Sequence, residues 1–313
     1  MSLPGPGASA EGSGLHALTL RAGTARAVVL PYGARIAALS LGGGPVFASY
    51  EDAGDNLGDE AYLGAVLGRT SGRVGGARVT VDGRTHALAA NAGDDQLHGG
   101  PEGFSRRVWS VAGRAEDRLS LALASPDGDQ GFPGRLEARL AFALTEDALR
   151  VEYEARADAP TPLSLTHHPY VRLSGTHALD HTVRANAAAW TPLTEAGIPT
   201  GEVRDVAGTP LDLSQPRRVG DLEEVLGGLD HGVVCPGGVR VAVSDGQRTL
   251  TVASDQTHCQ LFGAGTLGSP PGRHCGLAVE PQGWPDAEHH EGFEQRVLRP
   301  GETYRRWVEY RGS

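Results

Sequence analysis

The sequence contains no lysine, so all 28 of its cationic side chains are arginines. Against them stand 38 Asp and Glu residues, which leave a formal net charge of −10 at pH 7. Nucleic acids and anionic membrane surfaces bind basic patches, so this acidic balance argues against both as partners. A neutral or cationic small molecule suits the chain better.

Cysteine is scarce, and long apolar runs are absent. Cys235, Cys259 and Cys275 are odd in number and lack CxxC spacing, so the sequence indicates neither a disulfide framework nor a zinc site. Cysteines of this kind are typical of a reducing cytoplasm, which is our expectation for localisation. No apolar run approaches the ~18 residues that a membrane-spanning helix needs.

The N-terminal residues do not have the pattern of a secretory leader. Residues 1–14 are rich in Gly, Pro, Ser and Ala, without a basic segment or an apolar segment, so we expect a flexible tail. A chain of 313 residues could form two domains, but large β folds reach this length as one. We therefore expect residues 15–313 to form a single domain.

What the chain has in abundance is short strands separated by turns. Apolar residues alternate with polar ones over residues 136–144 and again over 149–155, on either side of a turn at Glu146-Asp147. Asp82-Gly83 marks another hairpin. The 45 glycines and 20 prolines are spread along the chain between such strands, and no long amphipathic helix is present. These patterns predict an all-β fold.

The strongest chemical signal is a histidine pair in residues 164–175. Pro169 follows His167 and His168 directly, and proline disfavours the helical region for the residue before it. We therefore expect extended backbone, in which the two side chains point to opposite faces and only one can enter a given cavity. The plain alternative is a strand-end histidine that is hydrogen-bonded by a neighbour.

Three loops carry weaker signals. In residues 91–100, His98 precedes two glycines, a pattern that marks either close backbone approach to a ligand or an ordinary turn. Residues 63–74 are glycine-rich but lack the GK[ST] ending of a phosphate loop. Residues 125–134 lack the closing glutamate of a calcium loop, so we interpret them as a β-turn.

A series of segments, in order from about residue 63 to residue 310, resembles landmarks of the aldose 1-epimerase (galactose mutarotase) family. They are Leu97-His-Gly-Gly100, Gly128-Asp-Gln-Gly-Phe-Pro-Gly134, His167-His-Pro-Tyr-Val-Arg-Leu173, Thr191–Glu202, Leu229-Asp-His231, Glu280-Pro-Gln-Gly-Trp-Pro-Asp-Ala287 and Leu298–Tyr304. The resemblance implies a large antiparallel β-sandwich of the galactose mutarotase type, with a sugar bound in an open cleft. It also implies interconversion of the α and β anomers of free aldohexoses, without a cofactor.

The resemblance further assigns residue roles. Glu280 would be the general base on the anomeric hydroxyl, and His168 the general acid on the ring oxygen, with His98 beside it. The sugar hydroxyls would be held by Arg73, Asp230 and Gln260. The expected partner is a small-molecule sugar, with no metal ion, and the expected assembly is a monomer or a homodimer.

The chemistry itself requires such a pair. Opening a hemiacetal ring removes the O1 proton and protonates the ring oxygen, and closing it reverses both transfers. A carboxylate and an imidazolium supply these steps without a nucleophile or a metal. We expect mutual attraction, with Asp230 nearby, to lower the pKa of Glu280 and raise the pKa of His168.

Other assignments of the same residues stay open. A metal site could combine the histidines and one acid, although strand alternation and the lack of HExxH spacing argue against it; the residues considered are His98, His167, His168, Glu288, His289 and His290. Trp284 is either a sugar-stacking platform or core, Asp286 is expected to shape the cleft at most, and residues 286–291 to form a solvated loop.

Two alternatives to the interconversion of anomers of free aldohexoses stay open. The family often has asparagine where this chain has Gly72 and His167, so the sugar preference could have drifted from galactose or glucose, which we expect by default. One alternative is an epimerase for phosphorylated hexoses on the same fold. Such an epimerase would need a cationic cluster, which Arg172 could begin. A sugar-binding or regulatory domain without turnover is the other alternative, but binding alone does not require Glu280 together with His168.

Overall fold

The computed structural model describes residues 15–313, and the tail expected at residues 1–14 lies outside the described residues. Strands dominate, and every strand pairing in this part of the chain is antiparallel. The only α-helix of residues 15–313 is α1 (Val219–Leu226), which Gly227 ends in the left-handed conformation. The five 3-10 helices are Ala53–Asn56, Gly75–Ala77, Phe104–Arg106, Asp129–Gly131 and Ala287–His289. The expected all-β fold is confirmed.

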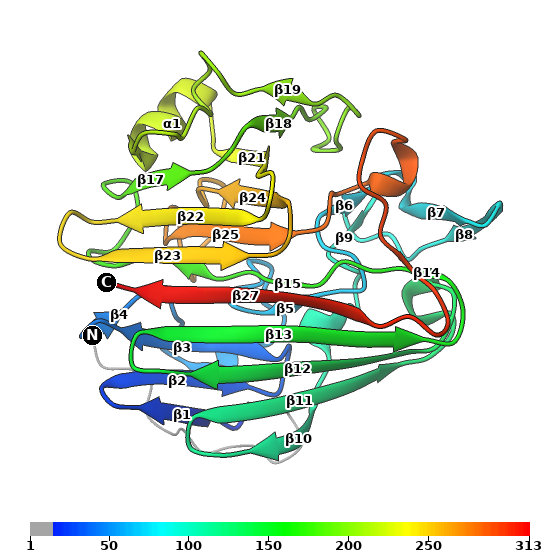
Figure 1. Ribbon diagram of the computed structural model, residues 1–313, viewed down its shortest axis with the longest axis horizontal. Coiled ribbons are helices and arrows are strands. Elements are labelled where there is room, and N and C mark those ends of the chain that lie inside the picture. The colour runs from blue at the N-terminus through cyan, green and yellow to red at the C-terminus, as the bar shows by residue number, and fades with distance from the viewer. Residues whose placement is uncertain (1–14) are drawn as a thin grey trace.

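The largest sheet has nine strands and faces the viewer in Figure 1. In spatial order they are β10 (Ser110–Arg114), β11 (Arg118–Ser125), β12 (Leu136–Leu144), β13 (Ala148–Ala157), β27 (Tyr304–Gly312), β23 (Thr249–Ser254), β22 (Val239–Ser244), β17 (Thr182–Ala185) and β20 (Arg217–Arg218). The alternation seen in residues 136–144 and 149–155 produces β12 and β13, whose register pairs Leu140 with Tyr153 and Phe142 with Val151.

Two further sheets lie against the inner face of the first. One has four strands: β1 (Leu18–Ala22), β2 (Ala25–Leu30), β3 (Arg35–Leu41) and β4 (Gly44–Pro45). The other has six: β16 (Tyr170–Val171), β25 (Leu277–Gln282), β24 (His258–Phe262), β21 (Asp230–Val234), β18 (Ala189–Thr191) and β19 (Arg204–Asp205). β1 and β2 contact β12, and β25 contacts β23. The molecule is therefore a sandwich of antiparallel sheets.

Four short strand pairs connect these sheets. They are β5 (Val66–Leu67) with β15 (Thr166–His167), β6 (Arg73–Val74) with β9 (Gln96–Leu97), β7 (Arg78–Val81) with β8 (Arg84–Ala87), and β14 (Thr161–Pro162) with β26 (Val297–Leu298). The β7–β8 hairpin turns at Asp82-Gly83, as the sequence predicts.

A single large cluster of buried side chains fills the space between the sheets. It includes Leu39 of the four-stranded sheet, Val279 of the six-stranded sheet and Tyr153 and Tyr310 of the nine-stranded sheet, each at most 1% exposed. Burying a side chain of this size contributes about 1.5–3 kcal/mol, so the cluster holds the layers together. No helix among residues 15–313 is long and apolar enough to cross a membrane.

Candidate active site

One row of side chains across the six-stranded sheet forms the floor of a pocket. Thr191 lies opposite Gly232, Gly232 opposite Gln260, and Gln260 opposite Glu280 in the strand register. Cross-strand partners project from the same face of a sheet, and so do alternate residues of one strand. Glu280 and Gln282 of β25 therefore both enter the pocket, while Val279, the residue before Glu280, enters the core.

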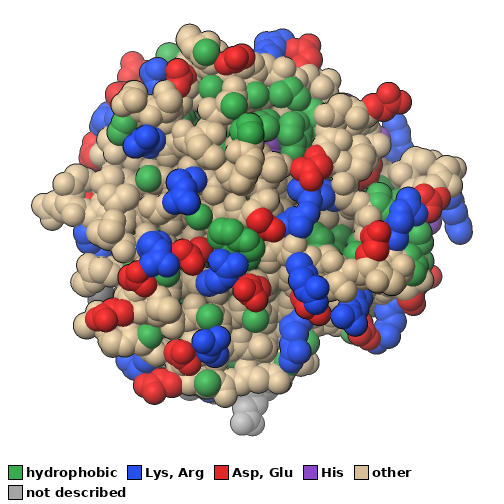
Figure 2. Space-filling model, in the orientation of Figure 1, with side chains coloured by type: hydrophobic (Ala, Val, Ile, Leu, Met, Phe, Trp, Pro, Cys, Tyr) green, Lys and Arg blue, Asp and Glu red, His purple; other side chains and the backbone are tan. Residues whose placement is uncertain are grey.

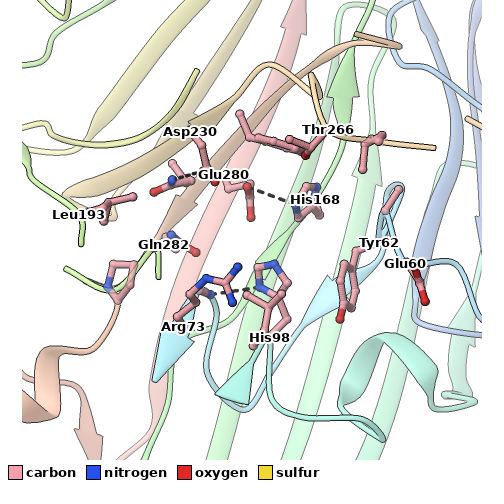
Figure 3. A pocket seen from close by; sticks show the side chains of 18 of the residues that line it. Glu60, Tyr62, Arg73, His98, His168, Leu193, Asp230, Thr266, Glu280 and Gln282 are labelled. Carbon is pink, nitrogen blue, oxygen red and sulfur yellow. Dashed lines mark hydrogen bonds and ion pairs between the residues drawn. The ribbon is translucent and has the colours of Figure 1, made fainter. Parts of the chain in front are cut away.

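The structure brings all six residues named from the sequence to this pocket. Asp230 (β21), Gln260 (β24) and Glu280 (β25) come from the sheet. The opposite wall contains Arg73 of β6 and His98, which follows β9, and His168 lies between β15 and β16; Figure 3 shows how these side chains converge. Strands far apart in the sequence thus build one cavity.

Glu280 and His168 form the central contact. The Nε2 atom of His168 lies 3.3 Å from Oε1 of Glu280, and the two residues are 4% and 2% exposed, respectively. The second carboxylate oxygen of Glu280, Oε2, is buried and has no hydrogen-bond partner among the described residues. That oxygen is available to a ligand hydroxyl, because a buried acceptor without a partner is costly to leave unsatisfied.

Burial, and not mutual attraction, sets the direction of both pKa shifts. Removal from water disfavours the charged form of each group, which lowers the pKa of His168 to about 4 and raises the pKa of Glu280 well above its ordinary value. The negative charge of Asp230 raises the pKa of Glu280 further. Our expectation that attraction would shift both values the other way is wrong. The two groups lie close enough together that they titrate as a coupled pair.

His98 is held as a neutral hydrogen-bond donor. The backbone N–H of Gly72 donates to its Nδ1 at 3.1 Å, so Nδ1 carries no proton and Nε2 does. Burial lowers the pKa of His98 well below its ordinary value, and the nearby His168 and Arg73 lower it further. A neutral imidazole can donate to a sugar oxygen without bringing a charge.

The glycine directly after His98 is required by the packing of the protein backbone. A Cβ atom on Gly99 would lie 1.8 Å from the carbonyl oxygen of Gly68, and the φ angle of Gly99 is +87°. Glycine is required here because the backbone at Gly68 passes close by. The close approach at Gly99 is therefore to the protein's own backbone. Gly72 has a similar constraint, since its Cβ would lie 2.8 Å from Cβ of Pro285.

The polar wall of the pocket combines acceptors and donors. Gln260 Nε2 donates to Asp230 Oδ1 at 2.6 Å, which orients both side chains. Figure 3 shows Arg73 beside His98, across the pocket from Asp230. Planar donors and carboxylate acceptors of this kind suit the vicinal hydroxyls of a sugar.

His167 lies outside the pocket, as strand alternation predicts. It is completely buried; the Tyr153 hydroxyl lies 2.8 Å from Nδ1, and the Ala34 carbonyl oxygen lies 3.0 Å from Nε2. These contacts are satisfied when Nε2 donates to the carbonyl and Nδ1 accepts from the hydroxyl. His167 is therefore a buried histidine held by its neighbours, whereas His168 is the histidine that enters the pocket.

The remaining candidates are placed away from the cavity. Trp284 does not line it, but packs on Phe293 and donates from Nε1 to Thr257, so it is a structural residue. Asp286 is only 4% exposed and accepts from the Gly75 N–H and pairs with two histidines, His289 and His290. The expectation of a solvated loop is thus wrong at Asp286.

Three potential metal ligands do come together. Donor atoms of His98, His168 and Glu280 lie within 4.8 Å of one another, and all three residues are buried. Two imidazoles and a carboxylate are also a donor set that zinc accepts. His167, Glu288, His289 and His290, which the sequence left open as ligands, do not belong to this group.

Sequence reasoning missed several residues of the pocket, among them Gln282 and Tyr62. Gln282 could have been found from its spacing of two positions after Glu280 in an extended strand. Tyr62 gives no such signal, because its φ angle of +53° and its place against the histidines depend on tertiary contacts.

Comparison with known proteins gives concordant matches. The family model described as aldose 1-epimerase matches residues 16–311. A galactose mutarotase from Bos taurus is 34% identical over 278 residues, covering 83% of this chain and 81% of that protein. An aldose 1-epimerase from Escherichia coli is 34% identical over 275 residues, covering 80% of each.

Solved structures show the same architecture. A galactose 1-epimerase from Lactobacillus acidophilus superimposes with a TM-score of 0.87 at 28% identity, covering 95% of this chain and 94% of that one. An aldose epimerase homologue from C. elegans gives a TM-score of 0.89 at 24% identity, covering 95% and 98% of the two chains. The second match concerns the fold alone.

Proposed function

The chain belongs to the aldose 1-epimerase family, and from that premise we propose how its pocket carries out the reaction. The enzyme is an isomerase that interconverts the α and β anomers of aldoses. The observation that carries the proposal is the buried His168–Glu280 contact at 3.3 Å, which places an acid and a base side by side in a sugar-sized, polar-lined cavity.

In the proposed mechanism Glu280 is the general base and His168 the general acid. Oε2 of Glu280 takes the proton of the anomeric hydroxyl, while His168 gives a proton to the ring oxygen and the C1–O5 bond breaks. The open-chain aldehyde then rotates about its C1–C2 bond. Return of both protons closes the ring on the other face, so neither residue is changed overall.

We propose that His168 and Glu280 share one proton around neutral pH. In the reactive form the proton is on His168 and Glu280 is ionised, whereas burial favours the proton on Glu280. Both arrangements have the same net charge, so they differ by one proton transfer inside the pair. Hydrogen bonds from a bound sugar hydroxyl to Glu280 stabilise its ionised form and favour the reactive arrangement.

Galactose or glucose is the proposed substrate, with Arg73, Asp230 and Gln260 holding its hydroxyls. Arg73 is the only cationic residue among the described residues that line the pocket, which also contains the carboxylates of Glu60, Asp230 and Glu280. A phosphorylated hexose would meet net repulsion there. Arg172 does not line the pocket, and its guanidinium donates to the carbonyls of Thr176 and Cys275.

For cellular setting we propose the cytoplasm and a monomer or homodimer that acts on free sugar. The three cysteines are buried and unpaired, which suits a reducing compartment. Figure 2 shows acidic and basic side chains interspersed over the nine-stranded sheet, without a field of basic residues that would attract nucleic acid.

Polarimetry tests the function directly. Freshly dissolved α-galactose and α-glucose should relax to the anomeric equilibrium faster when the protein is present. The protein should accelerate the relaxation of a hexose 6-phosphate only slightly. A chelator should not change the rate, because the proposed acid–base steps use no metal; loss of activity on chelation would favour the metal alternative.

Glu280→Gln tests the assignment of the base. The amide cannot accept the O1 proton, so we expect about a 10²–10⁴-fold lower rate with an unchanged circular dichroism spectrum. Glu288→Gln is the matched control, since Glu288 lies outside the pocket. A folded Glu280→Gln protein within a few-fold of wild type would remove Glu280 from the mechanism.

A further inference from the structure

A tyrosine with unusual backbone geometry lies at one end of the pocket. Tyr62 has a φ angle of +53°, in the left-handed region that bulky residues seldom adopt. Such a conformation costs about 1–3 kcal/mol and persists only where the surroundings enforce it. Tyr62 also lines the pocket that contains Glu280 and His168 (Figure 3). Contacts on both sides of Tyr62 must therefore hold this conformation.

The carboxylate of Asp59 holds the residues on both sides of Tyr62. Its Oδ1 accepts from the backbone N–H of Ala61 at 2.8 Å, and its Oδ2 accepts from that of Leu63 at 2.7 Å. Arg35 donates to Oδ2 at 2.6 Å in an ion pair whose side chains are 2% and 1% exposed. The Tyr50 hydroxyl donates to Oδ1 at 2.6 Å and completes four contacts.

The carbonyl groups of the same two residues are held as well. Arg35 donates to the carbonyl oxygen of Leu63 at 2.6 Å, and the Tyr170 hydroxyl donates to that of Ala61 at 2.9 Å. Both peptide groups flanking Tyr62 are therefore anchored to buried side chains. Buried charged hydrogen bonds of this kind are strong and geometrically specific, which explains how the strained conformation is maintained.

The ring of Tyr62 lies against both histidines of the site. It meets the His98 ring edge to face, with centroids 4.8 Å apart, and stacks on the His168 ring at 6.3 Å. The two histidine rings are themselves 5.5 Å apart at 88°. The three rings form one packed group, in which a shift of Tyr62 would allow either imidazole to move.

We propose that Tyr62 is a positioning residue for His98 and His168, and that the Asp59–Arg35 pair holds it in place. The inference rests on the proposed acid–base function of those histidines. Acid–base catalysis needs the imidazole within hydrogen-bond reach of the ring oxygen, and a misplacement of about 1 Å can cost on the order of 100-fold. The aromatic ring performs this role, and the phenol hydroxyl is not required for it.

The test compares four variants in kcat and KM, each checked for folding by its melting temperature. Tyr62→Ala should lower kcat by about 10- to 100-fold with KM within a few-fold of wild type, because orientation is lost rather than binding. Tyr62→Phe, which keeps the aromatic ring, should retain most of the wild-type kcat. Asp59→Asn should resemble Tyr62→Ala, since an amide cannot accept from both backbone N–H groups and the guanidinium.

Tyr50→Phe is the matched control for Asp59→Asn. It removes one bond to the same carboxylate but leaves both contacts that flank Tyr62. We expect a kcat within a few-fold of wild type. Ring NMR signals provide a readout independent of turnover: those of His98 and His168 should shift in Tyr62→Ala and Asp59→Asn, while that of His167 should not.

Several outcomes would overturn the inference. Tyr62→Ala with a raised KM and an unchanged kcat would make the ring a binding surface only. Equal losses of kcat in Asp59→Asn and Tyr50→Phe would mean that Asp59 contributes only to the stability of the fold. A Tyr62→Phe protein as slow as Tyr62→Ala would assign the positioning role to the hydroxyl group. An inactive wild type would overturn the proposed function instead, whereas an active wild type with four wild-type-like variants overturns only this inference.

Discussion

At the scale of single residues, burial decides the chemistry of the acid–base pair. The ordinary pKa values of about 4.3 for a Glu side chain and about 6.5 for a His side chain predict an ionised pair in mildly acid solution. In the folded protein desolvation acts on both groups at once and moves their pKa values in opposite directions, so that they titrate as a coupled pair. The sequence shows which residues pair, but it cannot show how far water is excluded from them.

The pH profile should report this pair. We expect kcat/KM to be level around neutral pH, to fall at acid pH where the pair gains a second proton, and to fall at alkaline pH where it loses its last one. The charge of Asp230 helps the pair to retain that proton. Asp230→Asn should therefore move the alkaline limb to lower pH, besides weakening sugar binding. A wild-type rate that stays flat into strongly alkaline solution would show that the proton comes from another group.

The adjacent histidines should respond differently to the same substitution. His168→Asn should lower kcat by about 10²–10⁴-fold with little change in stability. His167→Asn should keep kcat but lower the free energy of unfolding by about 1–3 kcal/mol, because it breaks the buried bonds to Tyr153 and Ala34. Polarimetry and urea unfolding of both proteins would separate these effects. Equal catalytic losses would mean that His167 also acts in the pocket.

The difference between the two histidines could be predicted because it depends on local geometry. Pro169 and the two-residue repeat of extended backbone are visible in the sequence. The role inferred for Tyr62 could not be predicted, because its conformation depends on Asp59, and on Arg35 from another strand. Contacts between distant segments leave no local pattern.

At the scale of elements, the site depends on strand register. The row of Thr191, Gly232, Gln260 and Glu280 joins four strands that are separated by long stretches of chain. Alternation within each strand is readable from the sequence, so the placement of Glu280 and Gln282 on one face follows from spacing. Which strands lie side by side does not follow from spacing. Only the resemblance of several motifs to one family linked them.

The loop that carries His98 should tolerate no side chain at Gly99. Gly99→Ala would place its Cβ 1.8 Å from the Gly68 carbonyl oxygen, displace His98 and lower kcat. Gly93→Ala is the matched control, because Gly93 also has a positive φ angle but no atom within 4 Å of its Cβ position. Both substitutions pay about 1–2 kcal/mol for the left-handed backbone, and Gly99→Ala about 1–3 kcal/mol more for overpacking.

Urea unfolding and steady-state kinetics of the two alanine variants check this expectation. Similar stability and activity in Gly99→Ala and Gly93→Ala would contradict it, since the backbone angle alone would then account for the requirement for glycine.

At the scale of the whole molecule, the final strand holds the largest sheet together. β27 pairs with β13 on one side and β23 on the other, so the last residues of the chain link the strands of residues 110–157 with those of residues 182–254 (Figure 1). The all-β class is predictable from alternation and turns. This long-range order is not, because the pairing of strands far apart in sequence depends on the packing of the complete core.

These links lead us to propose that residues 15–313 are one domain that unfolds as a unit. Val308 and Tyr310 of β27 lie in the same buried cluster as Val279 of β25, the strand that carries Glu280. Loss of the nine-stranded sheet should therefore also expose the strand beneath the active site. We expect far-UV circular dichroism and mutarotation activity to fall at one urea concentration, in a single transition. Activity lost at clearly lower urea than the sheet signal, or two separate steps in circular dichroism, would show that the pocket and the large sheet are independent folding units.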